Sequence, residues 1–349
     1  MVVIRADGNE HIGAGHIMRC LSIAEEIKKN DKCIVFVMAE EKFESLVKER
    51  GFETFVLHSD YSDMSSEEEM VIEYTKKIKP TALIVDSYFV TPHYLEKLRK
   101  ITKLIYIDDR MEFAYDVDMI INYNVFARED SYVKLYGNCD RKKPQLLLGT
   151  SYAPLRKQFL NSRITIKENV SDILVLSGAT DKQHVEKGLM EWLIQEKNML
   201  EKYRFHFVAG KLNSDYESLK KLAVKDNNLC IHYDVNDMKS LMCLCDVAVS
   251  AAGSTLYELC ACGIPAITYS FADNQMPAEH EFANRKIMLS VGDIRDNIRY
   301  LEQIMQCLEH LINDYKMRSD MSAKAFELVD GKGAGRIAEY IFKKQKFIR

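Results

Sequence analysis

Residues Val3–Met18, VIRADGNEHIGAGHIM, join a short apolar run to a glycine-containing loop and then to a helical pattern that starts at His16. A strand that turns through such a loop into a helix opens a parallel α/β sheet, whose ligands bind at the carboxyl ends of the strands. The predicted helix repeats apolar residues at helical spacing, at Ile17, Leu21, Ala24 and Ile27. A helix N-terminus carries about +0.5 charge, which opposes protonation of an imidazole. We therefore expect a neutral His16 at the ligand edge of a sheet.

The rest of the chain alternates between short apolar runs and helical patterns. Strands are expected at Val2–Ala6, Cys33–Ala39, Glu53–Leu57, Thr81–Asp86, Lys103–Asp108 and Asp118–Tyr123, and then at Asp172–Leu176, Tyr203–Ala209, Leu229–Tyr233, Asp246–Ser250 and Pro265–Ser270. This order predicts an α/β fold with parallel sheets and right-handed crossovers. Between the two groups the pattern fades around Gly137, Pro144, Gly149 and Pro154.

The length of 349 residues fits about two domains of roughly 150 residues each. We place a first Rossmann-like domain at residues 1–155 and a second at 156–349. After about residue 296 the sequence is helical and charged, and this last segment is able to return across the domain junction. No short repeat or low-complexity tract interrupts either half.

Composition excludes several classes of partner. The chain has 48 basic and 52 acidic residues without a basic stripe, so nucleic acid is not expected. No apolar run approaches the roughly 18 residues that span a bilayer, and Arg5, Asp7 and Glu10 stand where a signal peptide needs an apolar core. Nine cysteines, an odd number, favour a reducing compartment, which we take to be the cytoplasm. Cys260 and Cys262 lie about 200° apart on a predicted helix, so no zinc site is expected.

Polar side chains follow the strands of the first half at the expected ligand edge. They are His16, Asp86 with Ser87 and Tyr88, Asp108 with Asp109, and Asn122 with Asn124. Neighbours on a strand point to opposite faces, so Asp108 and Asp109 are not expected to share a proton. We expect one of them to orient a base or to cap a turn.

In the second half, two loops occupy the corresponding places: Ser177–Asp181 (SGATD) and Ser250–Glu258 (SAAGSTLYE). Small residues before a helix allow close backbone approach, Ser254 is expected to cap the helix, and the free N–H groups suit a diphosphate. Glu258, one turn into the helix, either accepts hydrogen bonds from ribose hydroxyls or only complements the helix dipole.

Other interpretations of the first loop stay open. Gly13 and Gly15 match part of a dinucleotide-binding fingerprint, but Met18 stands where the third small residue belongs, which disfavours nicotinamide or flavin. His16 could instead satisfy a buried backbone carbonyl. Arg19 shares a helix face with His16, and pairing with an acid is favoured over contact with phosphate.

A longer series of motifs resembles one family. It comprises RADGNEHIGAGHIMRCLSIA from Arg5, DSY from Asp86, DD from Asp108, IINYN from Ile120, GTSYAPLRKQF from Gly149, SGATD, SAAGSTLYE, and NQ at Asn274 and Gln275. In this order, over about residues 1–290, the chain resembles the UDP-2,4-diacetamido-2,4,6-trideoxy-β-L-altropyranose hydrolases of pseudaminic acid biosynthesis, which are related to spore-coat polysaccharide proteins. The resemblance implies two Rossmann-like domains that face each other across a cleft, as in glycosyltransferase-B enzymes. It also implies inverting hydrolysis without a metal or other cofactor, in which His16 activates water and UDP leaves.

The resemblance implies which residues contact the UDP-sugar: Gly15, Tyr88, Arg156, Gly253, Ser254, Thr255, Glu258, Asn274 and Gln275. Arg5, Arg19 and Arg156 lie within matching motifs but receive no firm role. Two departures are Ala179, where relatives commonly carry glycine, and the helical tail, which is shorter or absent in some members. A glycosyltransferase of the same fold, or a nucleotide-sugar-binding protein without catalysis, are the alternative functions. The sugar stereoisomer and the oligomeric state are not encoded in a motif.

Overall fold

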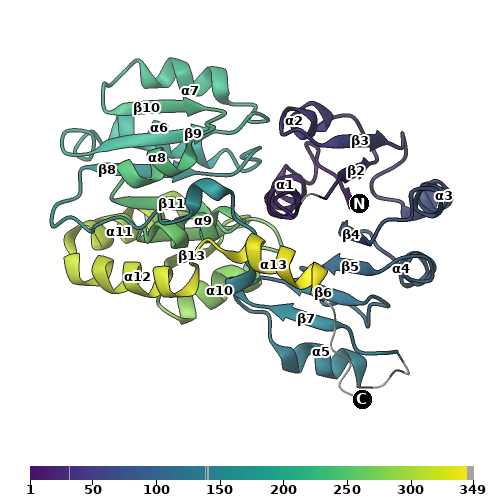
Figure 1. The fold of residues 1–349 in the computed structure, drawn as a ribbon. Coiled ribbons are helices and arrows are strands. Elements are labelled where there is room, and N and C mark those ends of the chain that lie inside the picture. Colours follow the sequence, from purple (N-terminus) through teal and green to yellow (C-terminus); the bar gives the residue numbers. More distant parts are fainter. Residues whose placement is uncertain (31, 138, 140, 344–349) are drawn as a thin grey trace. The chain divides into compact units, whose positions relative to one another are not determined.

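The computed structural model describes residues 1–30, 32–137, 139 and 141–343. Contacts divide the chain into two compact units (Figure 1). Unit 1 comprises Met1–Arg156 together with Lys332–Arg349, and unit 2 comprises Lys157–Gly331. The second domain expected from the sequence was 156–349, whereas the contacts assign α13 (Gly333–Phe342) to unit 1. No helix among the described residues is long and apolar enough to cross a membrane.

Unit 1 contains a parallel sheet of seven strands in the order β3-β2-β1-β4-β5-β6-β7. Its strands are β1 (Val2–Ala6), β2 (Ile34–Met38), β3 (Glu53–Val56), β4 (Ala82–Asp86), β5 (Leu104–Ile107), β6 (Met119–Asn122) and β7 (Gln145–Leu148). Its helices are α1 (Gly15–Lys28), α2 (Glu44–Glu49), α3 (Glu68–Ile78), α4 (Pro92–Arg99), α5 (Glu129–Tyr136) and α13 (Gly333–Phe342), with 3-10 turns η1 (Met64–Ser66) and η2 (Thr150–Tyr152).

Unit 2 repeats this architecture with six parallel strands in the order β10-β9-β8-β11-β12-β13. Its strands are β8 (Asp172–Leu176), β9 (Arg204–Ala209), β10 (Leu229–Tyr233), β11 (Val247–Ala251), β12 (Ala266–Ser270) and β13 (Leu289–Asp293). Its helices are α6 (Val185–Gln195), α7 (Tyr216–Ala223), α8 (Met238–Leu244), α9 (Thr255–Cys262), α10 (Met276–Asn284), α11 (Tyr300–Asn313) and α12 (Tyr315–Leu328), with the 3-10 turn η3 (Lys157–Phe159).

The central strands of both sheets are largely buried, whereas the edge strands β3, β7, β10 and β13 are partly exposed. β1, β2, β4, β5 and β6 are buried at every position, which explains why their sequences are continuous apolar runs without alternation. In α1, the expected apolar face is buried at Ile17, Leu21, Ala24 and Ile27. The sequence therefore predicted the parallel α/β class correctly.

The strand order reverses direction at one place in each sheet. In unit 1, β1 lies between β2 and β4, and Ala6 at the end of β1 pairs with Asp86 at the end of β4. In unit 2, β8 and β11 are the corresponding neighbours. Loops that leave two such strands diverge to opposite faces of the sheet and open a crevice for a ligand. The diverging loops after β1, β4 and β11 carry His16, Tyr88 and Ser254, whereas Asn274 and Gln275 follow β12.

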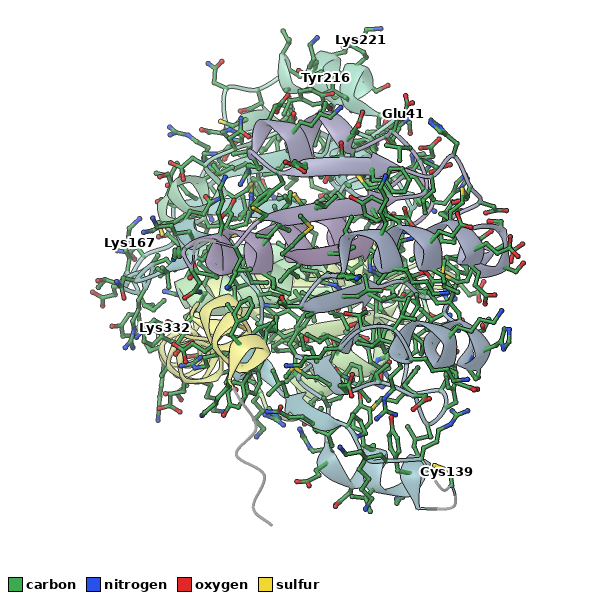
Figure 2. All side chains as sticks on the ribbon, turned by 45° about the vertical axis from the view of Figure 1, so that its right-hand side comes forward. Glu41, Cys139, Lys167, Tyr216, Lys221 and Lys332 are labelled. Carbon is green, nitrogen blue, oxygen red and sulfur yellow. The ribbon has the colours of Figure 1, made fainter. Side chains whose placement is uncertain are left out.

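The C-terminal helix α13 completes unit 1 by packing against α1 and η2. Lys332, labelled in Figure 2, is the residue that precedes this helix. Gly333 lies against the backbone of Tyr152 and Ala153 so closely that a Cβ atom would overlap the Ala153 carbonyl. The helix therefore returns to the first sheet through a contact that only glycine permits.

Candidate functional site

The loop after β1 delivers His16 to the carboxyl edge of the sheet. Asn9 and Gly13 form an isolated antiparallel bridge, and Gly13 adopts a positive φ of 74° that suits glycine. The side-chain carbonyl of Asn9 accepts hydrogen bonds from the backbone N–H groups of His11 and Ile12. α1 begins directly afterwards, with Gly15 exposed and His16 as its second residue.

His16 is 4% exposed and contacts the carboxylate at the end of the neighbouring strand. Its Nδ1 atom lies 2.6 Å from Oδ1 of Asp86. Since Ala6 and Asp86 are paired at the ends of β1 and β4, the strand order itself brings the two side chains together. The sequence placed both residues at this edge but did not pair them.

Arg19, one turn along α1 from His16, holds the same carboxylate from the other side. Its Nε donates to Oδ2 of Asp86 over 2.6 Å, and its Nη2 donates to Oδ1. Burial alone would raise the pKa of Asp86, but the charge of Arg19 and then the adjacent His16 hold that pKa well below its ordinary value. Asp86 is therefore a buried carboxylate that stays ionised.

The remaining nitrogen of Arg19 contacts a second acid and a tyrosine. Nη1 lies 2.8 Å from Oδ2 of Asp109 and donates to the hydroxyl of Tyr123 over 2.9 Å. Arg19 thus pairs with two carboxylates, as the pairing interpretation of the sequence favoured. Burial raises the pKa of Tyr123 to about 12, so this hydroxyl keeps its proton.

Tyr88 packs edge-on against His16. The two ring centroids are 4.4 Å apart, and the rings are inclined by 74°. Burial, reinforced by the nearby carboxylate of Asp109, raises the pKa of Tyr88 and keeps it neutral. Gly15, His16 and Tyr88 therefore lie together at this edge of unit 1.

Asp108 and Asp109 have separate roles, and among the described residues neither forms a hydrogen bond or ion pair with His16. Asp108 Oδ1 accepts from the backbone N–H groups of Arg110 and Met111, and Asp108 also accepts from the hydroxyls of Tyr115 and Tyr132. Asp108 therefore caps a turn, as one alternative proposed. The other alternative, that one of this pair orients the base, is corrected: Asp86 is the carboxylate at His16.

Arg5 is part of the interior of unit 1. Its fully buried guanidinium pairs with Asp7 and Glu67, and Glu67 also accepts a 2.7 Å hydrogen bond from the hydroxyl of Tyr94. All the recorded polar contacts of Arg5 are with this cluster. Arg5 therefore has a structural role within unit 1.

In unit 2, the loop after β11 leads into α9 with little side-chain cover. Ala251 and Ala252 are buried, Gly253 is half-buried, and a Cβ atom added to Gly253 would meet no atom within 4 Å. Ser254 is exposed at the N-cap position, but its side chain makes no capping hydrogen bond, which corrects the expected cap. The first N–H groups of α9 therefore have no side-chain cap from this residue.

The helix α9 carries the other expected contacts. Thr255 is its first residue, and Glu258 lies one turn further on, half-buried. The helix ends at Gly263, whose φ of 70° is the left-handed conformation that terminates helices. Glu258 lies in the first turn of the helix, where the helix dipole favours a carboxylate. Its position is therefore compatible with hydrogen bonding to ribose hydroxyls and with complementing the dipole.

The loop after β12 carries Asn274 and Gln275. Asn274 is exposed, whereas the side-chain oxygen of Gln275 accepts a 3.0 Å hydrogen bond from the backbone N–H of Phe271 and so shapes this loop. Because β12 is the neighbour of β11, this loop leaves the same edge of the sheet as the loop to α9. Arg156 is half-buried at the end of unit 1.

The SGATD loop after β8 is a braced turn. Ser177 donates its backbone N–H to Glu186 and shares a 2.7 Å hydrogen bond with the hydroxyl of Tyr269. Asp181 accepts from the N–H groups of Val185 and Glu186 at the start of α6. These bonds fix the loop beside the one that leads to α9, since β8 and β11 are paired.

The chain matches no protein-family model. It is 25% identical over 347 residues to the spore coat polysaccharide biosynthesis protein SpsG of Bacillus subtilis, covering 96% of each chain. It is 25% identical over 259 residues to the UDP-2,4-diacetamido-2,4,6-trideoxy-beta-L-altropyranose hydrolase of Campylobacter jejuni, covering 74% of this chain and 86% of the relative.

Among solved structures, MurG of Acinetobacter baumannii matches 98% of this chain and 99% of its own, with a TM-score of 0.69 and 13% identity. Other matches over nearly the whole chain include a glycosyltransferase of Rickettsia africae and the glycosyltransferase WaaG. At such identities the likeness concerns the fold. With two parallel α/β units of seven and six strands, the chain has the glycosyltransferase-B fold.

Proposed function

We propose that this protein is a nucleotide-sugar hydrolase that splits a UDP-linked diacetamido-trideoxy sugar into UDP and the free sugar, as a step in pseudaminic acid biosynthesis. The observation that carries the proposal is the contact between His16 and the ionised Asp86 at the strand-order reversal of unit 1. A histidine held by a carboxylate at the ligand edge of a sheet is the arrangement of a general base. The name of the Campylobacter jejuni relative supplies the sugar.

The reaction follows from this base. His16 takes a proton from water while the water oxygen attacks the anomeric carbon, and the bond from that carbon to the diphosphate oxygen breaks. UDP leaves with the bonding electrons, and His16 later returns its proton to solvent. A single displacement inverts the anomeric configuration. Tyr88, packed edge-on against His16 with the ring centroids 4.4 Å apart, would border the sugar.

Unit 2 would hold the nucleotide. The N-terminus of α9 presents backbone N–H groups and a partial positive charge, which stabilise a diphosphate as negative charge develops on it. The space beside Gly253 allows phosphate oxygens to approach the backbone of Ser254 and Thr255. Glu258 would accept hydrogen bonds from the ribose hydroxyls, and Asn274 and Gln275 would add polar contacts from the next loop. We propose that this electrostatic stabilisation suffices without a metal, so activity should persist in EDTA.

The decisive experiment is incubation with the UDP-sugar in ¹⁸O-labelled water without any acceptor. Hydrolysis at the anomeric carbon places the label in the sugar at early times and leaves UDP unlabelled. Label in UDP would mean attack at phosphorus and would contradict the assignment of the base. A glycosyltransferase of this fold would release no UDP until an acceptor alcohol is added. Screening stereoisomers of the diacetamido series then identifies the substrate.

Two variants separate chemistry from binding. His16→Ala is expected to lower kcat by about 10²- to 10⁴-fold, the usual contribution of a general base, with UDP affinity unchanged. Glu258→Ala is expected to weaken UDP binding about 10- to 100-fold, since a hydrogen bond to a charged group contributes roughly 1.5–3 kcal/mol, with a smaller effect on kcat. Unchanged turnover in His16→Ala would refute His16 as the base, whereas UDP binding without any turnover in the wild type would favour the alternative of a binding protein without catalysis.

A further inference from the structure

The Nδ1 atom of His16 faces two groups with opposite requirements. Asp86 Oδ1 lies 2.6 Å away, and Nη2 of Arg19 lies 3.1 Å away. A carboxylate only accepts hydrogen bonds, whereas a guanidinium only donates them. Nδ1 therefore either carries a proton and donates to Asp86, or lacks one and accepts from Arg19.

The geometry resolves this choice in favour of Asp86. The contact of 2.6 Å has the length of a charge-assisted hydrogen bond, and the contact to Arg19 is half an ångström longer. Arg19 already directs both Nε and Nη2 at the two oxygens of Asp86. If Nδ1 had no proton, its lone pair would face an ionised oxygen at 2.6 Å, and the two would repel each other.

We infer that Asp86, fixed by the Arg19 fork, holds His16 in the tautomer that carries its proton on Nδ1, so that Nε2 is the atom that takes the proton from the reacting water. This inference rests on the proposed function for the role of Nε2, but the tautomer itself follows from the contacts. Asp86 and Arg19 are thus positioning residues for His16. From the sequence, neither Asp86 nor Arg19 was predicted to position His16.

The charges around His16 also suit a group that becomes protonated. The charged cluster beside His16 consists of Arg19, Asp86 and Asp109. Arg19 contributes one positive charge, and the two carboxylates, both in contact with Arg19, contribute two negative charges. The other titratable groups that face this cluster are neutral: Tyr88, Tyr123, and the buried thiol of Cys20, which lies 3.4 Å from Asp86 Oδ2. With a neutral His16 the cluster carries one net negative charge. A proton on His16 brings it to zero, which stabilises the product of proton transfer.

Nitrogen NMR tests the tautomer in the unmodified protein. The full chain is labelled with ¹⁵N-histidine, its long-range proton–nitrogen spectrum is recorded at about pH 9, and the His16 signals are identified by their absence in His16→Gln. The expected result is a pyrrole-type Nδ1 and a pyridine-type Nε2. A pyridine-type Nδ1 with the proton on Nε2 would overturn the inference.

The variant Asp86→Asn adds a kinetic test. It preserves shape but removes the charge, and the amide is able to donate to Nδ1 as well as accept from it. The single tautomer should be lost, and kcat should fall by about 10²- to 10⁴-fold while KM changes little. The matched control is Asp130→Asn, the same change at an exposed residue of α5, which should leave both readouts unchanged. A fully active Asp86→Asn would contradict a positioning role.

The two proposals fail in different ways. If no UDP-sugar is hydrolysed, the proposed function is wrong, but the wild-type NMR spectrum still decides the tautomer. If hydrolysis is found and the proton lies on Nε2, the function stands and the inferred tautomer is refuted. Since the wild-type spectrum needs no substituted protein, poor folding of Asp86→Asn does not remove the test.

Discussion

Arg19 is the cation on which the arrangement at His16 depends, and Arg19→Met tests its contribution to stability. The side chain is 8% exposed and contacts both Asp86 and Asp109. Methionine has a similar length and restores part of the apolar packing of the arginine stem, but it leaves two carboxylates without their partner. A buried charge that loses its partner costs far more than a surface ion pair contributes.

The expected loss is about 4 kcal/mol, within the roughly 3–5 kcal/mol that follows removal of one member of a buried ion pair. Total folding free energies are typically about 5–15 kcal/mol, so the variant should still fold. With a dependence of about 2 kcal/mol per molar urea, the unfolding midpoint of unit 1 should fall by about 2 M.

The assay must report on unit 1 by itself. Hydrogen exchange of peptides from β1 and β4, followed by mass spectrometry across a urea series, does so, while the fluorescence of Trp192 on α6 reports on unit 2. The control is Arg110→Met, which breaks a partly exposed pair with Glu112 and should cost about 0–1 kcal/mol. Equal midpoint shifts in the two variants would refute the reasoning.

The difference should also depend on pH. In the wild type the pKa of Asp86 lies below its unfolded value of about 3.9, so its contribution is complete at pH 7 and is lost as the pH falls through and below that value. In Arg19→Met, burial should raise the pKa of Asp86, and mainly His16 opposes this rise. Acidification then protonates Asp86 and removes its buried charge. The difference in the free energy of unfolding between wild type and variant should therefore be smaller at pH 4 than at pH 7.

Three further outcomes are expected. Gly253→Val should leave the unfolding temperature nearly unchanged, because its Cβ meets open space, but should abolish UDP binding measured by calorimetry. Gly333→Ala should lower the stability of unit 1 by about 1–3 kcal/mol through overlap with the Ala153 carbonyl, whereas Gly335→Ala on the same helix should not, since its Cβ would meet only a side-chain atom at 3.7 Å. Tyr132→Phe should cost about 1–3 kcal/mol in chemical denaturation, because Asp108 loses a buried hydrogen bond of 2.6 Å.

The parallel α/β class was predictable because buried strands have continuous apolar sequences and helices follow them at regular intervals. Two edge strands were missed for local reasons. β7 has only four residues and follows Pro144, so it resembled a linker. β13 is half-buried, contains Gly292 with a positive φ, and pairs with β12 through a register shift. Short or irregular edge strands leave little periodic signal.

The sequence indicated which loops would carry the candidate site, but not which of its side chains would contact one another. Glycine turns after strands indicated where His16 and the loop to α9 would lie. The contact between His16 and Asp86 joins residues 70 positions apart, and it depends on β4 rather than β3 being the second neighbour of β1. One of the adjacent acids Asp108 and Asp109 was expected to orient a base or to cap a turn. The signal that pointed to Asp86 instead was that it is an aspartate at the end of a buried strand.

The packing of α13 on α1 has a consequence for how the chain is made. α1 is translated before the whole of unit 2, whereas its neighbour α13 is translated after it. At about 5–20 residues per second, the stretch 157–331 takes on the order of ten to thirty seconds to translate. During that interval α1 lacks its covering helix, so a nascent or prematurely terminated polypeptide exposes apolar surface that chaperones would recognise.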